Sequence, residues 1–92
     1  MAARPSPVQQ AQALLRTGKA SQARGLLEKA ARRSPRDPGV LSLLARAQIL
    51  TGETQRGTLT LERLVSIRPD DPTARAALGE QLLEQGRHAE AE

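Results

Sequence analysis

The stretch Gly52–Pro69, with the sequence GETQRGTLTLERLVSIRP, decides the fold because it repeats an earlier one. Thirty-four residues upstream, Gly18–Pro35 reads GKASQARGLLEKAARRSP in the same phase, and Gly86 opens the pattern a third time. When residues 4–37 are laid over residues 38–71 without a gap, eight positions are identical. A fixed period of this size predicts a stacked array of helical repeats.

The same residue types start and end helices in each repeat. Ser6-Pro7, Asp37-Pro38 and Asp71-Pro72 each combine a capping side chain with a proline suited to a first helical turn. Apolar residues recur at helical spacing up to Gly18, Gly52 and Gly86, which supply a left-handed stop. A second helix follows the glycine and ends at Pro35 or Pro69. We therefore expect helices at about 7–17, 22–33 (capped by Ser21), 38–51, 54–67 and 72–86, and the start of a sixth at 88–92.

The core has to be built from aliphatic side chains, because the chain contains no Phe, Trp, Tyr or Cys. The spacing places Leu27 and Leu61 at equivalent buried sites between the two helices of their repeats. Gly57, near the start of its helix, would allow a close helix contact at some loss of helix propensity. No alternation of period two suggests a strand. The sequence predicts an all-α array of antiparallel helix pairs, forming a single domain over residues 1–92.

Charge is distributed unevenly along the chain, whose net charge is +4. Residues 1–46 carry nine basic and two acidic residues, whereas residues 47–92 carry five basic and eight acidic ones. This polarity can steer an anionic partner to the N-terminal half, although a solvated face is the simpler interpretation. Nucleic-acid binding is an alternative function, but the chain has no aromatic platform on which bases stack. The phosphate-contact candidates are Arg16, Arg24, Arg32, Arg33, Arg36 and Arg46.

The sequence contains no constellation that indicates catalysis, a metal or a cofactor. Glu80 and Glu84 lie four residues apart on one helix face, but no Cys or His accompanies them as a ligand. His88 is the only histidine, and no nucleophile or carboxylate pattern surrounds it. No apolar run approaches the ~18 residues of a membrane span, and the start lacks the apolar core of a signal peptide. We expect a non-enzymatic, cytoplasmic protein without cofactors.

The repeated residues resemble the tetratricopeptide repeat, a helix-turn-helix unit of this length. Two full repeats, at about 4–37 and 38–71, and a partial one at 72–92 cover nearly the whole chain. The resemblance rests on small residues in the first helices, the turn glycines, small residues early in the second helices, a packed leucine and a final proline. These are Ala11, Ala45 and Gly79; Gly18, Gly52 and Gly86; Ala23, Gly57 and Ala91; Leu27 and Leu61; and Pro35 and Pro69.

The resemblance implies a right-handed superhelix whose first helices line a concave groove for a peptide or protein segment. By correspondence, the groove residues are Val8, Gln12, Arg16, Ser42, Arg46, Leu50, Ala76, Glu80 and Glu84. The chain departs from the family at its usual aromatic positions, which hold Pro7, Leu41 and Arg75 in one column and Leu14, Gln48 and Leu82 in the other. We therefore expect looser packing and a groove without aromatic anchors. Besides a binding or scaffolding module, the resemblance leaves open an N-terminal docking arm of a larger enzyme, such as a glycosyl- or sulfotransferase.

The C-terminal end of the array is expected to remain partly uncovered. After a stop at Gly86 only six residues remain, too few for a stable isolated helix. The face that carries Leu78, Leu82 and Leu83 would then lack a covering helix. Since burial of apolar surface favours association, we predict a homodimer through this end, with a monomer whose last helix is frayed as the alternative.

Overall fold

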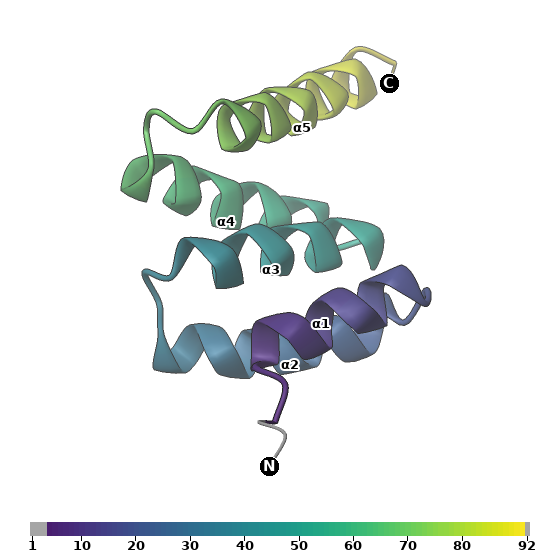
Figure 1. Cartoon of the computed structure of the whole chain (residues 1–92). Helices are drawn as coiled ribbons and strands as arrows, with labels where there is room; N and C mark the ends of the chain where they lie inside the picture. Colours follow the sequence, from purple (N-terminus) through teal and green to yellow (C-terminus); the bar gives the residue numbers. More distant parts are fainter. Residues whose placement is uncertain (1–3, 92) are drawn as a thin grey trace.

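Five helices stack one after another, with chain reversals between them (Figure 1). The structure, a computed structural model, describes residues 4–91, and for residues 88–91 only their place in the last helix. The helices are α1 (Pro7–Arg16), α2 (Ala20–Arg33), α3 (Pro38–Leu50), α4 (Thr54–Ile67) and α5 (Pro72–Ala91). Residues 4–91 contain no strand. The all-α prediction is confirmed, and the first four helices agree with their expected ranges within two residues.

The expected caps form at the first helix of each repeat. The Ser6 hydroxyl accepts a hydrogen bond from the Gln9 amide at 3.1 Å, while the Gln9 side chain accepts one from the Ser6 amide at 2.9 Å. In the second repeat, Asp37 Oδ1 accepts from the Gly39 amide at 2.9 Å. In the third, Asp71 Oδ1 accepts from the Thr73 amide at 3.0 Å. Each cap satisfies an amide that has no partner inside its helix.

Ser21, by contrast, does not cap the second helix. α2 begins at Ala20, with Lys19 at the cap position and no side-chain capping bond. The Lys19 amide donates to the Leu14 carbonyl at 2.8 Å, and the Lys19 carbonyl accepts from Ala23 at 3.1 Å. The turn therefore leads directly into α2, and Ser21 already lies inside the helix.

The three turn glycines do not behave alike. Gly18 and Gly52 have φ angles of +78° and +88°, in the left-handed region that ends α1 and α3. Gly86 is not among the glycines with positive φ, and α5 runs through it for 20 residues. The predicted stop at Gly86 and the predicted sixth helix are therefore wrong. A chain reversal lowers the free energy only when the helix that follows it packs against the preceding one. Continuing an existing helix, by contrast, adds one hydrogen bond per residue.

The buried hydrophobic residues form two clusters, one at each repeat junction. The first lies between α1, α2 and α3 and consists of Ala11, Ala23, Leu27, Ala30, Val40, Leu44 and Ala47. The second lies between α3, α4 and α5 and consists of Leu41, Ala45, Leu61, Leu64 and Ala74. Leu27 is completely buried and Leu61 is 4% exposed, which confirms their expected burial. Both clusters are purely aliphatic and rich in alanine, so neighbouring helices pack closely.

Candidate functional site

A hollow of about 390 Å³ lies between α3 and α5, with α4 beneath it. Its floor includes Leu61 and Leu64 of α4 and Ala74 of α5, which are nearly buried. Two of the residues that α5 places there, Ala74 and Ala77, are too short to fill the space above these leucines. The hollow is therefore a consequence of small residues on α5, and its floor is apolar.

The two walls of this hollow carry opposite charges. Arg46 projects from α3, while Glu80 of α5 and Asp71 of the preceding turn line the other side. None of the three takes part in an ion pair within the described part of the chain. Asp71 uses one carboxylate oxygen to cap α5. The apolar floor can hold an apolar side chain of a bound peptide. The cationic and anionic walls can orient that peptide through charged groups on either side of this side chain.

A second hollow, of about 300 Å³, lies between α1 and α3. Gln12, Leu15 and Arg16 line it from α1, and Leu43 and Arg46 line it from α3. Arg46 is shared by both hollows, so the two hollows adjoin along α3. The combined surface carries two arginines towards α1 and two acidic residues towards α5.

The structure brings together six of the nine groove residues that the family resemblance implied. Gln12 and Arg16 line the hollow between α1 and α3, Arg46 lines both, and Ser42, Leu50 and Glu80 line the hollow between α3 and α5. Glu84 lines a separate hollow with residues of α4 and is ion-paired to Arg87 at 3.1 Å. Val8 packs against the first cluster, and Ala76 is exposed away from these hollows.

Several lining residues were not expected from the sequence. Ile49, Thr73 and Gln81 contribute to the hollow between α3 and α5, together with its leucine floor. The sequence signal that marks them is weak. They lie next to the expected groove residues along each helix, and they line the hollow only because of the spacing between the helices.

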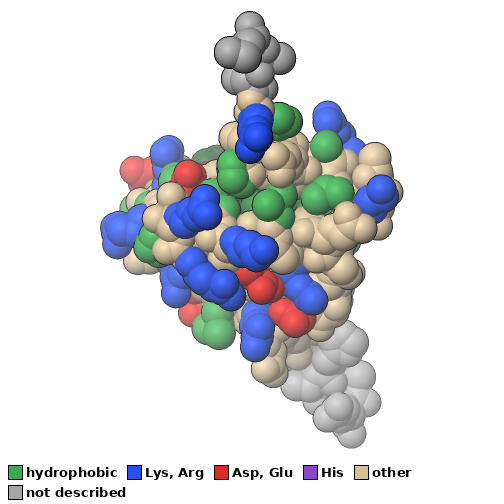
Figure 2. Space-filling view, turned by 90° about the horizontal axis from the view of Figure 1, so that it is seen from below, with side chains coloured by type: hydrophobic (Ala, Val, Ile, Leu, Met, Phe, Trp, Pro, Cys, Tyr) green, Lys and Arg blue, Asp and Glu red, His purple; other side chains and the backbone are tan. Residues whose placement is uncertain are grey.

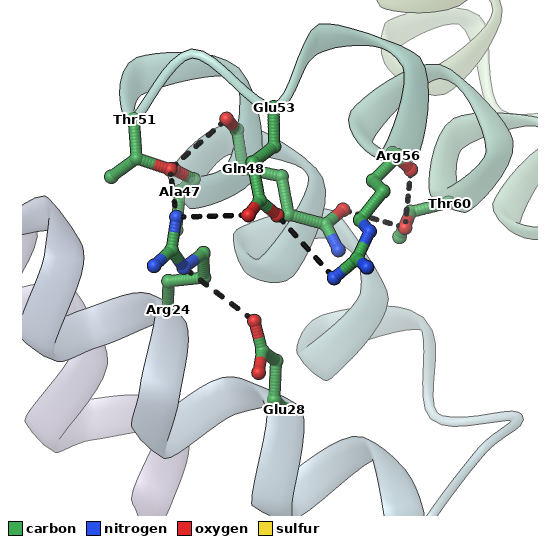
Figure 3. A network of polar contacts seen from close by, with 8 residues as sticks. All are labelled: Arg24, Glu28, Ala47, Gln48, Thr51, Glu53, Arg56 and Thr60. Atoms are coloured by element: carbon green, nitrogen blue, oxygen red, sulfur yellow. Dashed lines mark hydrogen bonds and ion pairs between the residues drawn. The ribbon is translucent and has the colours of Figure 1, made fainter.

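A polar network, also not expected, joins the first repeat to the second (Figure 3). Arg24 of α2 donates to the Thr51 hydroxyl at 2.9 Å and pairs with Glu53 at 3.3 Å and with Glu28 at 3.5 Å. Arg56 of α4 approaches the other Glu53 oxygen at 3.7 Å, and that oxygen accepts no hydrogen bond in the described structure. The network fixes the turn between α3 and α4 against α2. Its role is structural.

The α1–α2 end of the molecule is predominantly basic. Viewed from this end, the surface shows many Lys and Arg side chains and few Asp or Glu side chains (Figure 2). Of the acidic residues in the first half, Glu28 is paired to Arg24 and Asp37 caps α3. Four basic residues near the end of α2 have no ion-pair partner in the described part of the chain: Lys29, Arg32, Arg33 and Arg36.

Of the two reactive candidates considered from the sequence, the Glu80 and Glu84 pair and His88, only the pair has side chains among the described residues. No group of three His, Cys, Asp or Glu residues lies close enough there to hold a metal ion. The side chain of His88 lies outside the described residues, as does that of Ala91. None of the helices in the described part is both long and apolar enough to cross a membrane.

Stacked antiparallel helix pairs with adjoining hollows define a helical-repeat protein. A family model of the tetratricopeptide repeat matches residues 14–76, and a second one, also of the tetratricopeptide repeat, matches residues 72–92. The chain belongs to the tetratricopeptide-repeat family. Comparison with characterised proteins and with solved structures finds no match. Repeats of this family are generally protein-interaction modules, so binding a protein partner is the function that the family supports.

Proposed function

We propose that this chain is a non-catalytic module that binds an extended protein segment across α1, α3 and α5. The supporting observation is the pair of adjoining hollows, which combine an apolar floor with oppositely charged walls around Arg46. At ~8–10 Å between neighbouring helices, the surface spans ~20–30 Å. This length accommodates about six to nine extended residues at ~3.3 Å each.

The charges predict the order of the ligand's own charges. Arg16 and Arg46 favour an acidic end over α1 and α3, and Asp71 and Glu80 favour a basic end over α5. An aliphatic side chain in the middle of the segment would occupy the apolar floor between α3 and α5. The same charges weaken the nucleic-acid alternative for this surface, since a uniformly anionic strand would be repelled from the α5 wall.

Two fluorescent nine-residue peptides of identical composition test the proposal. In one, an acidic end and a basic end flank a leucine; in the other, their order is reversed. Both are titrated by fluorescence anisotropy at low and at high salt. We expect a preference of at least several-fold for one order, and a smaller preference at high salt because ions screen exposed charges.

Charge-exchange variants connect the preference to this site. The double variant Arg46→Glu with Glu80→Lys should abolish or reverse the preferred order, because it exchanges the charges at residues 46 and 80 while Arg16 and Asp71 keep theirs. The matched control is Arg63→Glu, a charge change on α4 at a hollow between α2, α3 and α4, which should leave the preference unchanged. Equal binding of both peptides, or a preference that persists unchanged in the double variant, would contradict the proposal. A single-stranded oligonucleotide that binds more tightly than either peptide would favour the nucleic-acid alternative.

A further inference from the structure

Within residues 4–91, no helix covers α5 in the way that α2 and α4 cover the equivalent helices of the first two repeats. Gly79 of α5 occupies the repeat position of Ala45 in α3 and Ala11 in α1. Ala45 is 1% exposed and Ala11 is completely buried. Gly79 is exposed instead, and a Cβ added to it would meet nothing within 4 Å. In the second repeat the covering helix is α4, whose Gly57 lies against the Ala45 carbonyl. The corresponding side of α5 is open.

The open side of α5 is a continuous stripe of apolar and small residues. Gly79, Leu82, Leu83 and Gly86 have the spacing i, i+3, i+4 and i+7, which places them on one helix face. Leu82 is 50% exposed and Leu83 is 56% exposed, whereas Leu78 packs against the second cluster. Among the described residues, no atom lies within 4 Å of a Cβ added at either glycine, so another helix can approach closely at each of them. The expectation of an uncovered face thus holds for Leu82 and Leu83, but Leu78 contributes to the core.

The order of residue types in the stripe, Gly-Leu-Leu-Gly, is the same in both directions along the helix. This symmetry indicates which partner covers the stripe. The boundary between Leu82 and Leu83 lies midway between Gly79 and Gly86. We propose that a second copy of this chain covers α5, with the two α5 helices antiparallel and a two-fold axis between Leu82 and Leu83. Each leucine then faces the other leucine of the partner copy, and each glycine faces the other glycine, as an isologous contact requires.

The charges beside the stripe suit the same arrangement. Glu80 lies next to Gly79, and Arg87 lies next to Gly86, on the same side of the helix. Arg87 already pairs with Glu84 of its own helix at 3.1 Å. Antiparallel pairing about the proposed axis also brings Arg87 of each copy beside Glu80 of the other, so residues of opposite charge face one another on the border of the contact. Parallel pairing would instead place each residue beside its own copy, with like charges facing one another.

The size of the contact predicts a weak dimer. α5 has 20 residues, which at 1.5 Å per residue is ~30 Å, and a helix is ~10 Å wide. Each copy thus buries ~300 Å², a total well below the ~1,200 Å² of stable complexes. We therefore expect a monomer–dimer equilibrium in the range of roughly 10 μM to 1 mM. The stripe itself shares no residue with the proposed peptide-binding surface, and only Glu80 borders both, so the dimer does not depend on the proposed peptide-binding function.

Sedimentation equilibrium over that concentration range tests the association. We expect the chain to change from monomer to dimer, and Leu83→Glu to shift the midpoint at least tenfold upward because it buries a charge at the axis. Leu59→Glu is the matched control, since Leu59 is 64% exposed on α4 and lies outside the stripe. A chain that is monomeric throughout, or one whose association is unaffected by Leu83→Glu, would overturn the proposal. The helical content of each variant, measured by circular dichroism, confirms that it is folded.

Cysteine pairing tests the antiparallel register, because the chain contains no cysteine of its own. Gly79→Cys and Gly86→Cys each introduce a side chain at an open position. Under oxidation, a mixture of the two variants should form a disulfide-linked dimer. Each variant alone should form little, because its two sulfurs would lie seven residues, or ~10 Å, apart along the helices. Rapid linkage of Gly79→Cys to itself, or no linkage in the mixture, would overturn the proposed arrangement.

Discussion

Gly57 of α4 lies so close to Ile49 of α3 that a Cβ at residue 57 would stand 2.6 Å from Ile49 Cγ1. The same Cβ would lie 3.2 Å from the Ala45 carbonyl oxygen. The absence of a side chain at Gly57 therefore sets the distance between the two helices of the second repeat. In the first repeat the corresponding residue is Ala23, which is fully buried. The two repeats thus use different pairs of side chains at the same junction.

Gly57→Ala should destabilise the protein although alanine is the better helix former. The overpacking costs about 1–3 kcal/mol, against a gain in helix propensity of about 1 kcal/mol. Urea denaturation would measure the net loss. Because Ile49 is the nearest obstacle, the double variant Gly57→Ala with Ile49→Ala should lose less stability than the sum of the two single variants. Strict additivity would mean that the two side chains do not compete for this space.

Gly52→Ala and Gly86→Ala should have opposite effects, although the two glycines occupy the same repeat position. Gly52 has φ +88°, where a Cβ costs roughly 1–2 kcal/mol. Gly86 lies inside α5 with no atom near an added Cβ, so alanine should gain roughly 0.5–1 kcal/mol. Thermal melting at a fixed low protein concentration would compare them. A destabilised Gly86→Ala variant would show that the chain reverses at Gly86 after all.

Leu27→Ala and Leu61→Ala should each cost about 2–5 kcal/mol, because both remove buried side chains that the surroundings cannot fully replace. Leu27 is completely buried and Leu61 is 4% exposed. Leu59→Ala is the matched control: Leu59 is 64% exposed on α4, so its loss should stay within about 0.5 kcal/mol. Chemical denaturation of all three variants would check this. Equal midpoints for the variants at residues 59 and 61 would be inconsistent with the orientation of α4.

Arg24→Met should weaken the junction between the first and second repeats. It removes the hydrogen bond to Thr51 and the ion pair to Glu53, which connect α2 to the turn after α3. Since the Arg24 side chain is 28% exposed, we expect a modest loss of about 0.5–1.5 kcal/mol. The loss should become smaller at high salt. Arg56→Met is the control, because its side chain is 70% exposed and should contribute almost nothing. Equal losses in the two variants would contradict a specific role for Arg24.

The candidate site could be predicted only in outline from the sequence. The repeat register placed Arg46 and Glu80 on first helices, and the structure finds both on one hollow. The register could not show that the Leu61 and Leu64 side chains form the floor of that hollow, nor that Ile49 and Gln81 line it. Those details depend on the separation of α3 and α5, which short side chains such as Ala77 set. No local pattern in the sequence reports that distance.

What the sequence by itself determined is the succession of helices. The caps at Ser6, Asp37 and Asp71 act within three residues of their own position, and Gly18 and Gly52 act through a single φ angle. What only the tertiary structure decided is whether a turn signal is used. Gly86 carries the same signal as Gly52, yet α5 runs through it, because a reversal becomes favourable only when a following helix packs back. That packing free energy comes from contacts between helices, and the face of α5 that carries Leu82 and Leu83 is exposed in the described structure.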